Sequence, residues 1–389
     1  MAHVVRSFKL RLLLAILACS AVIALEWGRR PAPASTAQAV WPRAATVVPG
    51  SVLTRNGQGL IPMPADTLSA HASSLLALPV SRSASLVAFW FAGTRESAPD
   101  VQIAASYFDR ATQQWSPTRF MVSRHVMGEQ LGFGVRRVGN PVAWLDPQGK
   151  IHLFVVATGL GGWAAARIVH LRQSNEGQAF SDLSFEVVRV LPLSWAWNIS
   201  FLVRNAPLML QDGGMVLPVH FELGIKYPVA LRFDAEGEFK GMVRMSSRKH
   251  VLQPTLLMLD KSRWLALMRD QHIAGHVAVA QTLDGGQHWS DLPDLALINP
   301  DSSVAGVALA PGLQFFAHNS SPHSRQILDL SRSADGENWS LAQTLAQGAG
   351  MAEYSYPAMT WADDSLWVSY TDHRKRIAWQ RFSWSATVR

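Results

Sequence analysis

The chain has 389 residues, 48% of them hydrophobic, and a formal net charge of +7 at pH 7. This is ample for a buried core, and length alone would allow two domains. The one dense basic run is His373–Arg376, so the charge pattern argues against a nucleic-acid-binding protein and suits an anionic ligand. A single cysteine, Cys19, excludes an internal disulfide.

The N-terminus has the pattern of a targeting segment. Basic residues up to Arg11 precede an apolar run over Leu12–Leu25. This predicts a secretory signal or an uncleaved membrane anchor over residues 1–27. The letters ILAC before Ser20 resemble a lipoprotein box, but the apolar run continues past them. We therefore expect export to the periplasm or the extracellular space, with membrane attachment left open.

Residues 28–64 are rich in proline, alanine, glycine and threonine, and are predicted to be a linker. From about residue 65 to 389, short apolar runs alternate with turn signals such as DPQG and QDGG. The runs are rich in valine, phenylalanine, tryptophan, leucine and tyrosine, which is typical of strands joined by hairpins. The sequence therefore predicts an all-β protein.

Two stretches repeat one frame, QTLDGGQHWS at 281–290 and SRSADGENWS at 331–340. In each, an Asp can cap the turn, a Gly can take positive φ, and a Trp can fold beneath it. Weaker relatives are RQSNEGQAFS and FDRATQQWS. The spacing of their aromatic ends gives a unit of about 50–65 residues, so this part of the chain holds about six four-stranded units. The sequence thus predicts a six-bladed β-propeller.

The repeated frame resembles the Asp-box, or BNR repeat, of bacterial sialidases, and the resemblance covers about residues 65–385. It implies a propeller with a central carboxylate-binding site. Enzymes of this family clamp the substrate carboxylate with three arginines, attack with a tyrosine activated by a glutamate, and protonate with an aspartate. The resemblance therefore implies an exported, retaining glycosidase acting on a terminal acidic sugar.

The carboxylate clamp matches in two positions out of three. LLMLDKSRWLALMRD resembles the segment of the second arginine and gives Arg269, and SPHSRQILDLSRSADG gives Arg325 as the third. A guanidinium fork binds both oxygens of a carboxylate. His71, in HASSL, stands where the first arginine is expected, and Arg95 is a candidate replacement.

The catalytic residues match less well. MAEYSYPAM resembles the nucleophile segment and gives Tyr354, with Tyr356 as its neighbour. Gln253 occupies the position of the activating glutamate, and an amide cannot accept the phenol proton. Substitute bases are Glu353 and Glu222.

For the proton donor, TRESAPDVQIAAS gives Asp100 as the best match, with Glu96 as its competitor. Other polar or aromatic candidates for the central cleft are Asn140-Pro141, Arg204-Asn205, His318-Asn319, Trp195 and Trp197.

No metal site and no cofactor is predicted. The expected partner is an acidic glycan or glycoconjugate, with no nucleic acid, and the expected state is a monomer. Because His71 and Gln253 depart from the family pattern, a non-catalytic glycan-binding propeller is the alternative function.

Overall fold

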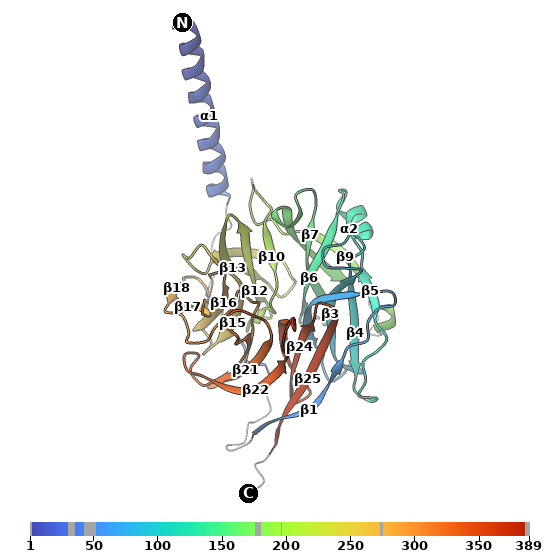
Figure 1. Cartoon of the computed structure of the whole chain (residues 1–389). Helices are drawn as coiled ribbons and strands as arrows, with labels where there is room; N and C mark the ends of the chain where they lie inside the picture. Colours follow the sequence, from blue (N-terminus) through green and yellow to red (C-terminus); the bar gives the residue numbers. More distant parts are fainter. Residues whose placement is uncertain are drawn as a thin grey trace.

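The computed structural model describes residues 2–29, 36–42, 52–175, 180–195, 197–272 and 275–385. Its strands form six sheets arranged as the blades of a propeller, which confirms the predicted fold (Figure 1). Each sheet is antiparallel, and sequential strands pair within it, as expected for hairpin-connected chain.

The first three blades use residues 69–244. The first holds β2 (Ser69–Ala77), β3 (Ala84–Gly93), β4 (Gln102–Asp109) and β5 (Arg119–Val122). The second holds β6 (Arg137–Leu145), β7 (Ile151–Thr158), β8 (Ala166–Gln173) and β9 (Phe185–Val190). The third holds β10 (Phe201–Val203), β11 (Leu208–Met209), β12 (Met215–Leu223), β13 (Ile225–Phe233) and β14 (Phe239–Arg244).

The other three blades complete the ring. The fourth holds β15 (Val251–Met258), β16 (Trp264–Asp270), β17 (Ala278–Thr282) and β18 (Ser290–Leu292). The fifth holds β19 (Ala305–Ala310), β20 (Leu313–Asn319), β21 (Ile327–Ser333) and β22 (Trp339–Gln347). The sixth holds β23 (Tyr354–Ala362), β24 (Ser365–Asp372), β25 (Arg376–Ser385) and β1 (Val52–Leu60).

The sixth blade joins the two ends of the propeller chain. Strand β1 pairs antiparallel with β25 along its length, from Val52 opposite Ser385 to Leu60 opposite Ala378. The predicted linker over residues 28–64 is therefore wrong for this segment, which is the outer strand of a blade. The sequence of β1 shows no alternation of apolar and polar residues, because an outermost strand packs against few neighbours. Only Leu53 of β1 is buried.

A second part of that segment also packs on the propeller. Residues 36–42 run against the third and fourth blades, where the Ala39 amide donates to the Lys261 carbonyl at 2.8 Å and Gln211 donates to the Gln38 carbonyl at 2.8 Å. Ala37 and Ala39 are buried. This short stretch lies against core residues instead of spanning solvent.

Three short helical elements and one long helix complete the described chain. These are α1 (Ala2–Gly28), α2 (Arg124–Leu131), η1 (Gly162–Ala165) and η2 (Phe180–Asp182). Helix α1 projects from the propeller (Figure 1), and its part from Phe8 to Gly28 is long and apolar enough to cross a membrane. A secretory signal has the same character, so this is compatible with the predicted signal or anchor.

The two strong repeats act as turn staples, as their residue types predict. Asp284 accepts the backbone N–H groups of Gln287 and His288, both at 3.0 Å, in the β17–β18 turn. The Trp289 indole donates to the Gly286 carbonyl at 3.1 Å. The second copy repeats these bonds in the β21–β22 turn. In the weaker copy RQSNEGQAFS, Glu176 and Gly177 lie outside the described residues.

Large side chains fill the space between blades. Four tryptophans are fully buried, one each in the first, second, fourth and sixth blades: Trp90, Trp144, Trp264 and Trp367. The innermost strands β2, β6, β10, β15, β19 and β23 surround the centre. Polar residues lie at the N-terminal ends of β2, β6, β15 and β23, before β19 and after β10. Mostly apolar residues of these strands and the segments beside them line a cavity with Trp41 at the opposite end. The polar end is therefore where a hydrophilic ligand can be bound.

Candidate functional site

One residue with left-handed backbone is associated with each innermost strand. The six lie within the strand or just before it, with φ between 44° and 69°: Ala72, Asn140, Ser200, Gln253, Asp301 and Tyr356. Such backbone is uncommon for residues other than glycine and is often found at functional sites. In β2, β6, β15 and β23 a bulge in the strand pairing accompanies it.

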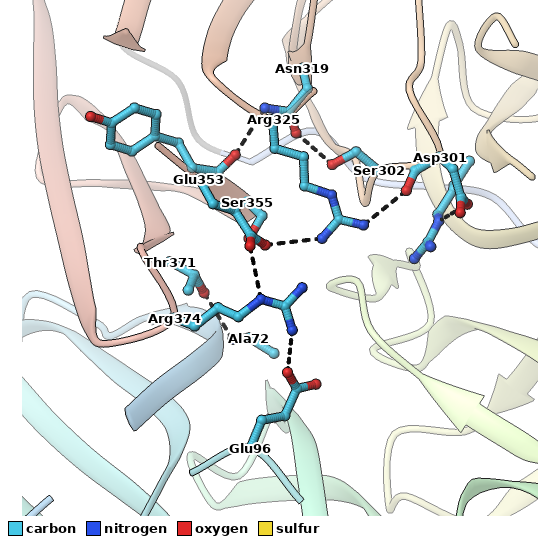
Figure 2. A network of polar contacts seen from close by, with 12 residues as sticks. Ala72, Glu96, Asp301, Ser302, Asn319, Arg325, Glu353, Ser355, Thr371 and Arg374 are labelled. Carbon is cyan, nitrogen blue, oxygen red and sulfur yellow. Dashed lines mark hydrogen bonds and ion pairs between the residues drawn. The ribbon is translucent and has the colours of Figure 1, made fainter. Parts of the chain in front are cut away.

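Charged side chains from four blades form a continuous network at this end (Figure 2). Glu353 accepts from Arg325 Nη1 at 3.1 Å and from Arg374 Nε at 2.9 Å. Arg374 also pairs with Glu96 of the first blade. The network therefore holds two guanidinium groups on either side of one carboxylate.

The network continues into the fourth blade through Asp301. Arg325 Nη2 donates to the Asp301 carbonyl at 2.9 Å, and Arg269 Nε donates to the Asp301 carboxylate at 2.6 Å. Arg269 Nη1 donates to the Gln253 side-chain oxygen at 3.2 Å. Burial opposes the charge of Arg269, but the bond to Asp301 and the neighbouring Tyr356 hydroxyl raise its pKa above the ordinary value.

A fourth arginine lies deeper. Arg204, which follows β10, is 2% exposed and donates to the carbonyls of Ser73 at 3.2 Å and Pro357 at 2.8 Å. Its guanidinium lies 5.1 Å from the centre of the Tyr356 ring. Burial lowers its pKa to about 10, so it is still a cation at neutral pH. It adds positive charge beneath Tyr356.

His71 packs against the same tyrosine. The ring centroids of His71 and Tyr356 are 4.2 Å apart, and His71 is 1% exposed. Both of its ring nitrogens lack a hydrogen-bond partner in the described structure. Burial and the nearby Arg374 hold the pKa of His71 well below its ordinary value, so the imidazole is neutral at pH 7.

The structure distinguishes between the two tyrosines. Tyr356 contacts His71 and lies beside Arg204 and Arg269. Tyr354 instead packs edge-on against Tyr370 and His373, with ring centroids 6.2 Å and 5.3 Å away. The bulge between Ser355 and Ala358 separates two side chains that a regular strand would place on one face. The structure therefore places the side chain of Tyr356 beside the clamp candidates, and that of the predicted Tyr354 against Tyr370 and His373.

The loop after β3 places its acidic residues differently from the prediction. Asp100 is exposed, and its carboxylate accepts the Thr94 backbone N–H at 2.8 Å and the Thr94 hydroxyl at 3.0 Å. Burial works against ionisation, but these bonds lower the pKa of Asp100, so it stabilises its own loop as an anion. Glu96, its competitor, reaches the central network through Arg374. Arg95, in the same loop, is exposed.

Glu353 is held as an anion by its two arginines. Burial opposes ionisation, but the Arg374 and Arg325 guanidinium groups and the Ser355 hydroxyl lower the pKa of Glu353 to about 2. A carboxylate this weakly basic is a poor proton acceptor, so its contacts do not support the predicted role as a base. Glu222, the other suggested base, pairs with Lys226 at 3.0 Å and lies near His220.

The pairing of Glu353 makes a testable contribution to stability. The folded pKa is below the unfolded one, so the stabilisation is complete above about pH 4.5 and disappears as pH falls toward 2. We expect Glu353→Gln to lower the free energy of unfolding at pH 7 by roughly 2 kcal/mol. Urea unfolding at pH 7 and pH 3 measures it, and the difference from the parent should shrink at pH 3. An equal difference at both pH values would contradict the pairing.

Several site residues were missed or only partly anticipated from sequence. Arg374 belongs to the basic run His373–Arg376, and that run was the available signal. Asp301 gave no signal, because its partner Arg269 is 32 residues away. Asn205 and Asn319 join neighbouring blades, each bonding two backbone carbonyls. Trp195 and Trp197 are about half exposed, on the loop between the second and third blades.

Comparison with known proteins agrees with this architecture. The family model of the BNR repeat-like domain matches residues 84–368. The chain belongs to this family. No curated protein matches the sequence.

Several solved structures share the fold at low sequence identity. A Hadza microbial sialidase superposes with a TM-score of 0.67 at 16% identity, covering 83% of this chain and 68% of its own. Trypanosoma rangeli sialidase in complex with sialic acid superposes with a TM-score of 0.62 at 14% sequence identity, and the match covers 89% of this chain and 60% of that one. A Dyadobacter fermentans protein of unknown function gives 0.62 at 12%, covering 86% of this chain and 100% of its own.

The chain thus spans about 60% of the length of the T. rangeli enzyme. The propeller fold is what these structures have in common with it.

Proposed function

We propose that this protein is an exported glycosidase that binds a terminal acidic sugar by its carboxylate and cleaves it with retention at Tyr356. The observation that carries the proposal is the position of Tyr356, beside the guanidinium groups of Arg204 and Arg269. A neutral phenol can attack next to a carboxylated sugar without the charge repulsion that a carboxylate nucleophile would meet. The sialidase resemblance of the segments around Arg269 and Arg325 supports the same substrate class.

The carboxylate clamp consists of Arg269, Arg325 and Arg374. They come from the fourth, fifth and sixth blades, and Arg374 supplies the positive charge that His71 does not supply in place of the first arginine. A substrate carboxylate would compete with Glu353 for Arg325 and Arg374, forming bonds of the same charge-assisted kind.

For the chemistry, the Tyr356 oxygen forms a bond to the anomeric carbon while the glycosidic C–O bond breaks. Glu96 is the acidic residue of this loop that reaches the network, because Asp100 is engaged by Thr94. Once the substrate carboxylate displaces it from Arg374, Glu96 can take a proton from solvent and pass it to the leaving oxygen. Gln253 cannot take the phenol proton, and His71 is a weak base whose ring nitrogens form no hydrogen bond in the described structure. The proton therefore passes to water, while Arg204 and Arg269 stabilise the phenolate. Water then cleaves the glycosyl-tyrosine bond, which restores the phenol and gives retention.

A second function is favoured by Gln253 itself. Its amide oxygen bonds to Arg269, so the position that carries the activating glutamate in the family helps to orient the clamp here. This supports a glycan-binding propeller without turnover. Release of product from fluorogenic α-ketosides and uronides, beside thermal stabilisation by the free acidic sugars, separates the two functions.

The clamp predicts a specific loss of affinity. We expect Arg269→Ala to weaken the binding of an acidic sugar by about 10- to 100-fold, because a charge-assisted interaction is lost. Isothermal titration measures it in either function. Arg263→Ala is the matched control, since Arg263 pairs with Asp260 in an exposed turn of the same blade. Equal affinity in the two variants would contradict the assigned clamp.

A further inference from the structure

Two histidines and an aspartate meet beside the candidate site, at the junction of the third and fourth blades. His250 precedes β15, Asp270 ends β16 and His272 follows it. The pairing of β15 with β16 puts Val251 opposite Asp270, which brings His250 to the same edge. One potential ligand atom from each of the three residues lies within 4.8 Å of the others.

The distances within this cluster fit ligands sharing one ion. His272 Nδ1 lies 3.0 Å from Asp270 Oδ1, and His250 Nε2 lies 3.7 Å from Asp270 Oδ2. Metal bonds of about 2.0–2.1 Å in a tetrahedron separate neighbouring ligand atoms by about 3.3 Å, between these two values. The longer distance exceeds that of a hydrogen bond.

The cluster also has the surroundings of a site with an open coordination position. Asp270 is 4% exposed and is oriented by the His272 backbone N–H, which donates to Oδ1 at 2.8 Å. The two imidazole rings are in contact, with centroids 3.9 Å apart. The His272 side chain is 64% exposed, so solvent and ions reach the group.

The geometry points to a divalent first-row metal site, with Zn²⁺ as the fitting ion, held by His250, Asp270 and His272. Two neutral imidazoles and one carboxylate suit Zn²⁺. No metal site was predicted from the sequence, because the three ligands are brought together only by strand pairing. Asp270 follows Arg269 directly, so a bound ion would fix the end of β16 that carries the clamp arginine. The inference does not depend on the proposed function.

Titration of Zn²⁺ into the full-length chain tests this site. The protein is purified in detergent without an oligohistidine tag, stripped with EDTA, and followed by calorimetry and thermal unfolding. We expect saturation at about one Zn²⁺ per chain and a higher midpoint of unfolding. His272→Gln should weaken the affinity by at least about tenfold and abolish the stabilisation. Co²⁺ should give the visible spectrum of a four-coordinate ion in the parent only.

His288→Gln is the matched control. His288 is exposed and pairs with Asp284 at 2.6 Å, which makes it a histidine–aspartate pair in the same blade. Unchanged Zn²⁺ affinity in His288→Gln together with loss in both His272→Gln and His250→Gln supports the site. No saturable binding, or equal binding in the His272→Gln chain, overturns it. Because no sugar is present, neither result bears on glycosidase activity.

Discussion

Replacing Tyr356 by phenylalanine is expected to reduce glycoside hydrolysis by about a thousandfold or more, with the fold intact. The substitution removes only the oxygen that would form the covalent bond, and loss of a nucleophile is among the largest single-residue effects on catalysis. The ring, its packing on His71 and its contact with Arg204 are retained. The measurement is the release of fluorophore from the acidic glycoside that the parent protein cleaves.

Tyr354→Phe is the control for this prediction. Tyr354 is two residues away on the same strand, but its ring packs on Tyr370 and His373 outside the charged network. We expect that variant to keep activity within about threefold of the parent, as for a substitution that touches no reacting group. Loss of activity in Tyr354→Phe with retention in Tyr356→Phe would contradict the placement of the nucleophile. Loss of binding in Tyr356→Phe without any turnover in the parent would favour the glycan-binding function.

A chain that begins at residue 65 is expected to be much less stable than one that begins at residue 50. The shorter chain lacks β1, which closes the sixth blade by pairing with β25. It also loses the burial of Leu53 and Ile61, which are 7% and 1% exposed. Two buried aliphatic side chains correspond to about 3–6 kcal/mol of unfolding free energy, before any cost of the exposed strand edge.

Urea unfolding of the two chains measures this difference directly. Both lack α1 and residues 36–42, so the comparison isolates β1 and the few residues beside it. Exposure of the β25 edge should also increase self-association, because an open edge offers unpaired backbone groups. Equal midpoints of unfolding would show that β1 is dispensable and that the propeller can begin at residue 65, as the sequence analysis predicted.

The position of the charged network supports the proposal that one face of the ring binds an anion. Glu353 links Arg325 to Arg374, and Asp301 links Arg325 to Arg269. These pairs hold long side chains in fixed positions when no ligand is bound. Under the proposed function, a carboxylate ligand would replace protein contacts with similar ones, and the arginines are already oriented for it.

The sequence by itself determined the fold class. The strand-and-turn pattern and the two Asp-boxes at residues 281–290 and 331–340 depend on local chemistry, which a sequence displays directly. Arg269 and Arg325 were proposed from the resemblance of their segments to those of sialidases, and both belong to the charged network of the structure. The N-terminal apolar run was also recognisable in the sequence, and it lies within helix α1 of the structure.

Only the tertiary structure decided which residues meet. Tyr356 rather than Tyr354 reaches the centre because left-handed backbone at Tyr356 breaks the alternation of β23. Strand β1 was not recognised because its pairing partner lies more than 300 residues away, and an outer strand buries too few side chains to show a period. Arg374, Asp301 and the His250–Asp270–His272 group depend on contacts between separate strands and blades. Such contacts form when the six blades close into a ring, so they cannot be predicted from a local sequence pattern.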